Sequence, residues 1–317
     1  MEISLYAGSS VSDLAASVAA ELGVPLSDPS LTRHPDGEVN VVLKESVRGR
    51  DVYLLQSTCP PVNENLVELL VLLDACKRAA AKRVTAVMPY YGYARQEKKS
   101  QGREPITARL VADLLTVAGA ERVVTIDIHS PAIQGFFDIE MDNLTAEPLL
   151  LDYLRTFPRD SLVVVAPDAG RVKVAEKFSR GLNLPLGVLV KRRLTSQEVE
   201  VQQVIGEIAG RRVILVDDII SSGGTIQRSI EALIQAGAED GVVVVATHGL
   251  LVGDAVDRLN RVPITDLVVT DCVPLPPEKA AALNARVHVQ SVAGLLAETI
   301  RCLSEDRPLS PLYGPTS

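Results

Sequence analysis

The chain has no tryptophan, only 3% aromatic residues, and a net charge of −8. An acidic chain is poorly suited to nucleic acid or an anionic membrane as its main partner. No apolar run approaches bilayer length, and Met1–Ser4 is not a basic region followed by a long apolar run. The cysteines are scattered without metal-type spacing, so no zinc site is indicated: Cys59, Cys76, Cys272 and Cys302. We therefore expect a soluble, unprocessed protein of the reducing cytoplasm.

With those classes set aside, length and composition are typical of a globular protein with more than one domain. The 317 residues are 47% hydrophobic and 23% charged, with no long low-complexity run. A chain of this length fits two domains better than one. We place the boundary near Thr145–Pro148, which gives expected domains of residues 1–145 and 146–317.

Short apolar runs alternate along the chain with segments of helical periodicity. The runs are Val84–Met88, Val123–Ile128, Leu162–Ala166, Val213–Val216 and Val242–Ala246. The helical segments include Asn65–Ala81, Ile106–Ala118 and Ile226–Ala236. Such alternation predicts an α/β fold of mainly parallel sheets flanked by helices, with ligands beyond the carboxyl ends of the strands.

The most informative stretch follows the run Val213–Val216, where two carboxylates are expected to end a strand and a turn of small residues leads into a helix. Glycines let backbone N–H groups approach an anion, hydroxyls add donors, and the helix presents its positive end. Carboxylates beside an anion repel it unless they bind sugar hydroxyls or a metal, so the stretch predicts a sugar-phosphate site. An ordinary strand-to-helix turn is the alternative. The candidate residues are Asp217, Asp218, Ser221, Ser222, Gly223, Gly224 and Thr225.

Polar residues also follow other predicted strands. His129 and Asp168 each come just after an apolar run, and if both line one cleft they can hold Mg²⁺ together with phosphate oxygens. A lone histidine at such a place is more often a hydrogen-bonded core or rim residue. The three cations Lys191–Arg193 suit a polyphosphate, with a surface basic patch as the alternative.

Two further segments carry candidate ligands. Pro89–Lys99 crowds three tyrosines and a basic stretch together, and Arg95 can stack on a base or neutralise phosphate. The segment from there to Pro105 is predicted to be a loop, and a solvated charged loop explains it equally well. Asp36–Glu38 places two carboxylates around a glycine, a pattern that predicts a hairpin turn.

Taken jointly, these pieces resemble the ribose-phosphate pyrophosphokinase family over almost the whole chain. The stretch after Val216 also looks like the phosphoribosyl-binding motif that this family shares with phosphoribosyltransferases. The other matching segments, in order, are Asp36–Glu38, Gln56–Thr58, Pro89–Gln96, Arg103–Ala108, Ile133–Asp138 and Lys191–Arg193.

The resemblance implies a reaction in which the C1 hydroxyl of ribose 5-phosphate attacks the β-phosphorus of MgATP, giving phosphoribosyl pyrophosphate and AMP for nucleotide biosynthesis. It implies two phosphoribosyltransferase-like (Rossmann-like) domains, the first for ATP and the second for ribose 5-phosphate, with the terminal helix 291–303 packing on the first. It also implies a homo-oligomer of dimers that build a hexamer, in which the Asp36–Glu38 turn can serve a neighbour's site.

The roles implied for single residues follow the family motifs. ATP is expected at Asp36, Gly37, Glu38, Arg95 and Gln96. Mg²⁺ is expected at His129 and Asp168, and catalysis on the transferring group at Lys191 and Arg193. Ribose 5-phosphate is expected at Asp217, Asp218, Ser221, Ser222, Gly223, Gly224 and Thr225.

The chain departs from the family pattern at four places. His34 stands where relatives often carry Phe, Arg171 replaces a glycine after the metal aspartate, and Ser221-Ser222 replaces Asp-Thr. Residues 194–197 lack a proline-rich sequence. A phosphoribosyltransferase would explain the turn after Val216 but not the segments before residue 100. A non-catalytic regulatory subunit is the other alternative. The departures at Ser221 and Arg171 favour it, and it is opposed by the retained His129, Asp168, Lys191 and Arg193.

Overall fold

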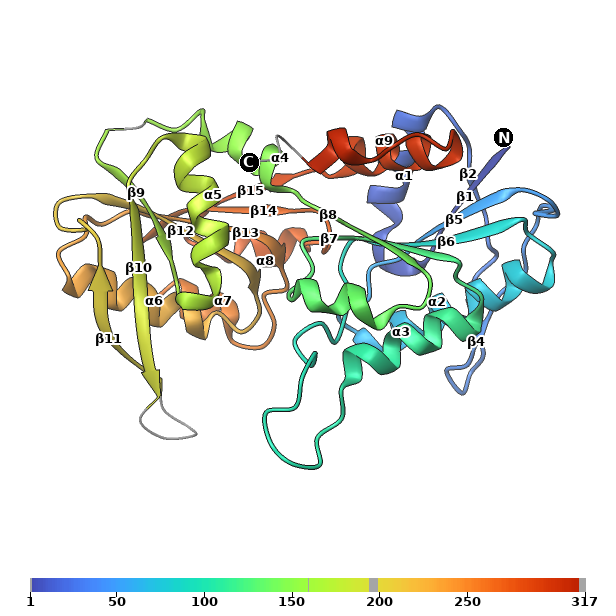
Figure 1. Ribbon diagram of the computed structural model, residues 1–317, viewed down its shortest axis with the longest axis horizontal. Coiled ribbons are helices and arrows are strands. Elements are labelled where there is room, and N and C mark those ends of the chain that lie inside the picture. The colour runs from blue at the N-terminus through green and yellow to red at the C-terminus, as the bar shows by residue number, and fades with distance from the viewer. Residues whose placement is uncertain (1, 159, 194–198, 314–317) are drawn as a thin grey trace. The chain divides into compact units, whose positions relative to one another are not determined.

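A computed structural model of the chain describes residues 2–158, 160–193 and 199–313. The chain forms two compact units, each with its own sheet (Figure 1). Unit 1 comprises Met1–Thr145, Cys272–Pro274 and Ser291–Ser317, and unit 2 comprises Ala146–Asp271 and Leu275–Gln290. Among the described residues, no helix has the length and apolar character that crossing a bilayer requires.

Unit 1 is built on a six-stranded sheet in which all neighbouring strands are parallel, in the order β2-β1-β5-β6-β7-β8. Its middle strands are apolar and covered on both faces, as parallel strands usually are. The bounds are β1 Ile3–Ala7, β2 Leu26–Ser27, β5 Asp51–Leu55, β6 Arg83–Met88, β7 Arg122–Ile126 and β8 Glu140–Leu144.

Helices cover both faces of this sheet. Figure 1 shows α2 and α3 on one face and α1 and α9 on the other. The α9 helix comes from the end of the chain and packs on α1, where Arg301 donates a hydrogen bond to the carbonyl of Glu21 (3.0 Å). The bounds are α1 Ser12–Leu22, α2 Val62–Arg78, α3 Thr107–Ala118 and α9 Ala293–Ser304, with 3₁₀ turns η1 Ser9–Val11, η2 Pro131–Phe136 and η4 Ser310–Tyr313.

Unit 2 is built on a seven-stranded sheet in the order β11-β10-β9-β12-β13-β14-β15. All pairs are parallel except β10 with β11. The valine run of β13 is buried at every position, since β-branched side chains suit a strand covered on both faces. The bounds are β9 Leu162–Ala166, β10 Leu186–Arg193, β11 Val199–Ile205, β12 Arg212–Ile220, β13 Val242–Gly249, β14 Ile264–Thr270 and β15 Arg286–Gln290.

The helices of unit 2 follow the helical period. Ile226, Ile230 and Leu233 form the buried stripe of α6 and pack with Val213 and Val244 of the sheet. The bounds are α4 Glu147–Leu154, η3 Ala169–Arg171, α5 Val172–Leu182, α6 Gly224–Gln235, α7 Ala255–Leu259 and α8 Pro277–Ala281.

The expected α/β class with mainly parallel sheets is confirmed, and the expected helices are present with shifted ends. The helix expected over Asn65–Ala81 is α2, Val62–Arg78. It ends early because Ala80 adopts a left-handed conformation, with φ of 59°, that a helix cannot continue through.

The core of unit 1 offers a direct test of this packing. Leu69 on α2 is 0% exposed in the main apolar cluster, whereas Leu110 on α3 is 53% exposed. We expect Leu69→Ala to lower the free energy of unfolding by about 2 to 5 kcal/mol, because it leaves a cavity. Leu110→Ala is the matched control and should change it by less than about 0.5 kcal/mol. Urea unfolding followed by circular dichroism measures both, and equal midpoints would contradict the packing.

Candidate functional site

The turn between β12 and α6 lies at the carboxyl edge of the sheet in unit 2. The expectation that the strand ends before Asp217 is wrong, because β12 continues to Ile220. Its partner β13 is long enough to pair with Ile219 and Ile220 through His248 and Gly249. On the other side, pairing with β9 is described only as far as Leu215. The two carboxylates therefore belong to the last part of a strand rather than to the turn.

The turn itself, Ser221–Thr225, has a backbone suited to binding an anion, and we call it the anion cradle. Gly223 is the N-cap of α6 and has φ of 73°, a left-handed value that favours glycine. A Cβ atom there would also lie 3.2 Å from the carbonyl oxygen of Ala255. The first N–H groups of α6 have no intrahelical acceptor, so they and the positive end of the helix suit an anion. Ser221, Ser222 and Thr225 place hydroxyls on the same turn.

Two arginines that were not among the predicted site residues, Arg228 and Arg258, flank this cradle. Arg258 of α7 donates to the carbonyl oxygen (3.3 Å) and the hydroxyl (3.4 Å) of Ser222. A Cβ atom at Gly224 would lie 3.1 Å from a guanidinium nitrogen of Arg258 and 3.6 Å from one of Arg228. Arg228 follows Gly224 by one helical turn, a spacing that the sequence displays. Arg258 lies on another helix, so no local spacing points to it.

The turn after β9 carries Asp168 and Arg171. Asp168 caps η3, since its Oδ1 accepts a hydrogen bond from the N–H of Gly170 (2.9 Å). Arg171 reaches the end of β12, with Nε 3.5 Å from Asp217 Oδ1 and Nη2 3.0 Å from Asp218 Oδ2. Burial and then the neighbouring Asp218 raise the pKa of Asp217, and the guanidinium of Arg171 opposes that rise. The structure therefore brings Arg171 and both carboxylates together.

In unit 1, His129 follows β7 and is half-buried. Asp127 has φ of 43° and leaves the strand in a left-handed conformation. β8 holds this exit, because Asn143 Oδ1 accepts from the N–H of Ile128 (2.9 Å) and Leu144 accepts from that of Asp127 (2.9 Å). Burial raises the pKa of Glu97, but the hydrogen bond with Lys98 and the charge of His129 lower it below its usual value.

Arg95 and Gln96 are exposed and lie in the segment 89–106 that links β6 to α3. Before them, Tyr91 is buried and its hydroxyl donates to the carbonyl of Ala108 (2.9 Å). The side chain of Gln96 is oriented by Thr107, whose hydroxyl donates to Gln96 Oε1 (2.6 Å). These two hydrogen bonds support a segment that exposes the guanidinium of Arg95 and the side-chain amide of Gln96. Residues 95–106 contain no helix or strand, as expected for a loop.

Asp36, Gly37 and Glu38 form the turn of a short hairpin, β3 Thr32–Arg33 with β4 Val39–Asn40, so the predicted hairpin turn is confirmed. Within the turn, Asp36 Oδ1 accepts from the N–H of Glu38 (3.1 Å). The three residues are exposed. The structure places them on a separate element from Arg95 and Gln96.

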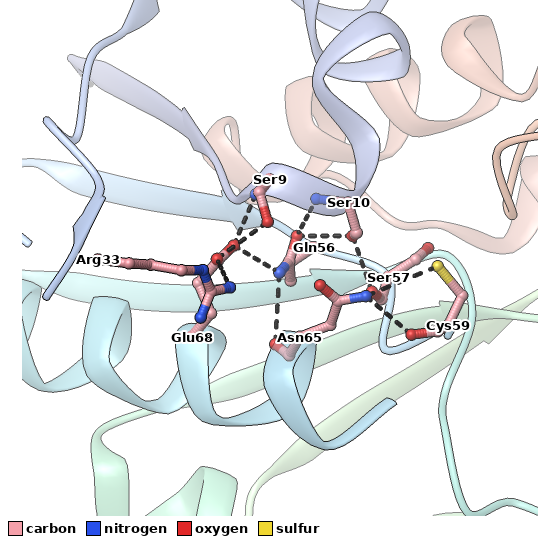
Figure 2. A network of polar contacts seen from close by, with 8 residues as sticks. All are labelled: Ser9, Ser10, Arg33, Gln56, Ser57, Cys59, Asn65 and Glu68. Atoms are coloured by element: carbon pink, nitrogen blue, oxygen red, sulfur yellow. Dashed lines mark hydrogen bonds and ion pairs between the residues drawn. The ribbon is translucent and has the colours of Figure 1, made fainter. Parts of the chain in front are cut away.

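A buried polar network anchors the base of this hairpin (Figure 2). Glu68 of α2 is fully buried and pairs with Arg33 of β3, Oε2 to Nη2 3.1 Å. The same carboxylate accepts from the N–H (2.6 Å) and hydroxyl (2.9 Å) of Ser9 and from Gln56 Nε2 (2.8 Å). Gln56 in turn accepts from the N–H of Ser10 (3.0 Å). Four donors thus surround one buried carboxylate, which offsets its desolvation.

Lys191 and Arg193 belong to the last residues of β10, and the structure describes their backbone but not their side chains. The departure at residues 194–197 lies outside the described residues. Within the part of the chain that the structure describes, no group of three or more His, Cys, Asp or Glu residues could hold a metal ion.

A cavity of about 750 Å³ in unit 1 lies away from the candidate residues. It opens at the amino ends of β5 and β6, and Asp51 and Arg83 line it. Arg83 pairs with Asp51 (Nε to Oδ1, 3.1 Å) and with Asp306 (3.2 Å). Because these carboxylates compensate the charge of Arg83, we assign it a structural role and do not include the cavity in the candidate functional site.

Comparisons with known proteins cover nearly the whole chain. A family model described as the N-terminal domain of ribose phosphate pyrophosphokinase matches residues 3–119, and one described as a phosphoribosyl synthetase-associated domain matches residues 192–314. The ribose-phosphate pyrophosphokinase of Caldanaerobacter subterraneus is 46% identical over 98% of each chain. Ribose-phosphate pyrophosphokinase 1 of Lactococcus lactis is 44% identical over 98% of this chain and 96% of its own. The crystal structure of phosphoribosylpyrophosphate synthetase from Mycobacterium smegmatis has a TM-score of 0.89 at 42% identity, covering 96% of this chain and 100% of that one.

The buried network makes a testable prediction about stability. Glu68→Gln replaces one carboxylate oxygen with an amide NH₂ group, which cannot accept a hydrogen bond. If it replaces Oε1, it faces the donors of Ser9 N–H and Gln56. If it replaces Oε2, it faces the donors of the Ser9 hydroxyl and Arg33. We expect the free energy of unfolding to fall by about 1 to 3 kcal/mol, because donors are left unpaired. Glu64→Gln, at an exposed position of the same helix, is the control and should be near neutral. Thermal and urea unfolding measure the difference, and equal stability of the two variants would refute the network's role.

Proposed function

This chain belongs to the ribose-phosphate pyrophosphokinase family, and we propose that it transfers the β,γ-pyrophosphate of MgATP to the C1 hydroxyl of ribose 5-phosphate. The hydroxyl oxygen attacks the β-phosphorus and loses its proton, the bond from that phosphorus to the α,β-bridging oxygen breaks, and AMP leaves. The observation that carries the proposal is the anion cradle that follows β12, the strand whose last part carries a pair of carboxylates.

Unit 2 carries the donors and acceptors that we assign to the sugar substrate. The backbone N–H groups and hydroxyls of Ser221–Thr225 provide donors for the 5-phosphate, and Arg228 and Arg258 add positive charge beside them. Asp217 and Asp218 are acceptors for sugar hydroxyls. Phosphate and hydroxyl groups of one small sugar would then be bound by consecutive parts of one strand and turn.

Unit 1 carries the exposed side chains that we assign to ATP. Arg95 presents a guanidinium that can stack on the base or pair with phosphate, and Gln96 lies beside it. We assign Asp36, Gly37 and Glu38 to the same substrate, either in this chain or in a neighbouring copy. In this proposal residues 1–145 form the ATP-binding domain and residues 146–317 the ribose 5-phosphate-binding domain, with Cys272–Pro274 and Ser291–Ser317 belonging to unit 1.

Lys191 and Arg193 are proposed to act on the transferring group. Pyrophosphoryl transfer requires positioning and neutralisation of developing negative charge more than any covalent chemistry. A lysine supplies a compact charge and an arginine a planar fork, so the pair suits oxygens of the β- and γ-phosphates.

An imidazole and a carboxylate, those of His129 and Asp168, suit a magnesium ion that binds together with ATP. Mg²⁺ in nucleotide sites is commonly bound by one or two protein groups together with substrate phosphates and water. We assign His129 and Asp168 to the ion, which would neutralise phosphate charge when bound.

We further propose that the protein works in the cytoplasm as a homo-oligomer of dimers that build a hexamer. The four cysteines are buried, and in the described part of the chain none forms a disulfide bond, which suits a reducing compartment.

The reaction is tested by incubating the protein with ribose 5-phosphate and MgATP and resolving the products by phosphorus NMR. We expect AMP to appear in step with a 1-pyrophosphorylated ribose. ADP in place of AMP would indicate an ordinary kinase. Binding of ATP with no turnover would favour a regulatory subunit, so either result would overturn the proposal.

The role of Lys191 gives a second prediction. Lys191→Ala should lower kcat by about 100-fold or more, because a charge that stabilises the transition state is lost, with the circular dichroism spectrum unchanged. Lys177→Ala is the control, since Lys177 is exposed on α5 and pairs with Glu147. An unchanged kcat in Lys191→Ala would remove that residue from the proposed mechanism.

A further inference from the structure

Arg171 links the turn after β9 to the last part of the neighbouring strand β12 in unit 2. Its backbone belongs to the first turn, where its N–H donates to the carbonyl of Asp168 (3.1 Å). Its side chain reaches the last part of β12, which pairs with β9 in parallel. One residue thus joins the turn of Asp168 to the strand that leads into the anion cradle.

The contact is a fork. Nε lies 3.5 Å from Asp217 Oδ1 and Nη2 lies 3.0 Å from Asp218 Oδ2. The N–H of Asp218 also donates to Asp217 Oδ1 (2.9 Å). Successive side chains of a regular strand point to opposite faces. A single guanidinium that contacts both neighbours therefore holds the two carboxyl groups in an arrangement that strand geometry alone does not provide.

The charge of Arg171 matters because all three groups are largely buried. Their side chains are only 15%, 11% and 8% exposed for Arg171, Asp217 and Asp218. Two adjacent buried carboxylates repel each other and any anion beside them. A guanidinium between them offsets part of that charge next to the site proposed for a sugar phosphate.

We propose that Arg171 is a positioning residue for the sugar: it holds Asp217 and Asp218 ready to accept hydrogen bonds from two sugar hydroxyls and reduces their repulsion of the 5-phosphate. The inference rests on the proposed function. The opposite arrangement, in which Arg171 blocks the carboxylates until sugar displaces it, predicts tighter sugar binding when Arg171 is removed. The anchored backbone and low exposure of Arg171 favour the positioning role.

Two substitutions separate charge from geometry. Arg171→Met keeps most of the apolar stem and loses the charge, while Arg171→Lys keeps the charge and loses the planar fork. Arg180→Met is the matched control, because Arg180 lies on the helix α5 that follows Arg171, is 71% exposed and pairs with Glu176. Each full-length protein is assayed for KM and kcat with both substrates, and ribose 5-phosphate binding is measured by calorimetry.

We expect Arg171→Met to raise KM and Kd for ribose 5-phosphate about tenfold or more, since hydrogen bonds to charged groups are worth roughly a decade in affinity. KM for ATP should stay within about twofold, and Arg171→Lys should be intermediate. The preference in kcat/KM for ribose 5-phosphate over 2-deoxyribose 5-phosphate should shrink in Arg171→Met, because the hydroxyl acceptors are no longer held in place. Arg180→Met should match the wild type in each measurement.

Three results would overturn the inference. These are unchanged sugar binding in Arg171→Met, tighter sugar binding in that variant, and equal loss for both substrates with a lowered melting temperature in both Arg171 variants. If the wild type binds ribose 5-phosphate without turning it over, the proposed function fails, yet the calorimetric comparison still decides the role of Arg171. If the wild type does not bind the sugar at all, both fail.

Discussion

Parallel pairing of β12 with β9 and β13 is the constraint on which the site in unit 2 depends. Parallel strands leave a sheet at one edge, so the turns after β9 and β12 become neighbours although they lie about 50 residues apart in the chain. Arg171 of the first turn then contacts Asp217 and Asp218, which precede the cradle on β12. The longer partner β13 carries the strand on to Ile220 and so determines where the cradle begins.

The same electrostatic problem is solved twice, once in each unit. A buried carboxylate must be compensated by charged or hydrogen-bonding partners, or its ionised form is unfavourable. Glu68 is compensated by Arg33 and three further donors, a saturated arrangement that suits a structural role (Figure 2). Asp217 and Asp218 instead both contact the guanidinium of Arg171. Burial and the neighbouring Asp218 keep the pKa of Asp217 raised in that setting, although the guanidinium of Arg171 opposes the rise.

These arrangements also explain why departures from a family pattern need not mean lost function. Arg171 stands where the family usually has glycine, and the structure gives its side chain two carboxylate partners rather than open solvent. Ser221 and Ser222 replace an acidic and a hydroxyl residue, yet the cradle's backbone depends on Gly223, which is retained. Substitutions that keep the backbone conformation can thus change the charge of the candidate site while they preserve the shape of the turn.

The sequence by itself determined the fold class, the positions of most strands and helices, the hairpin turn at Asp36–Glu38 and the candidate cradle, because periodicity and turn residues act over a few neighbouring positions. The roles of the individual site residues, including Lys191 and Arg193, stay predictions. Only the tertiary structure decided the full length of β12, the fork of Arg171 on Asp217 and Asp218, and the approach of Arg258 to Ser222. Each of these depends on which strands pair and which turns meet, and partners that distant in the chain leave no local pattern to read.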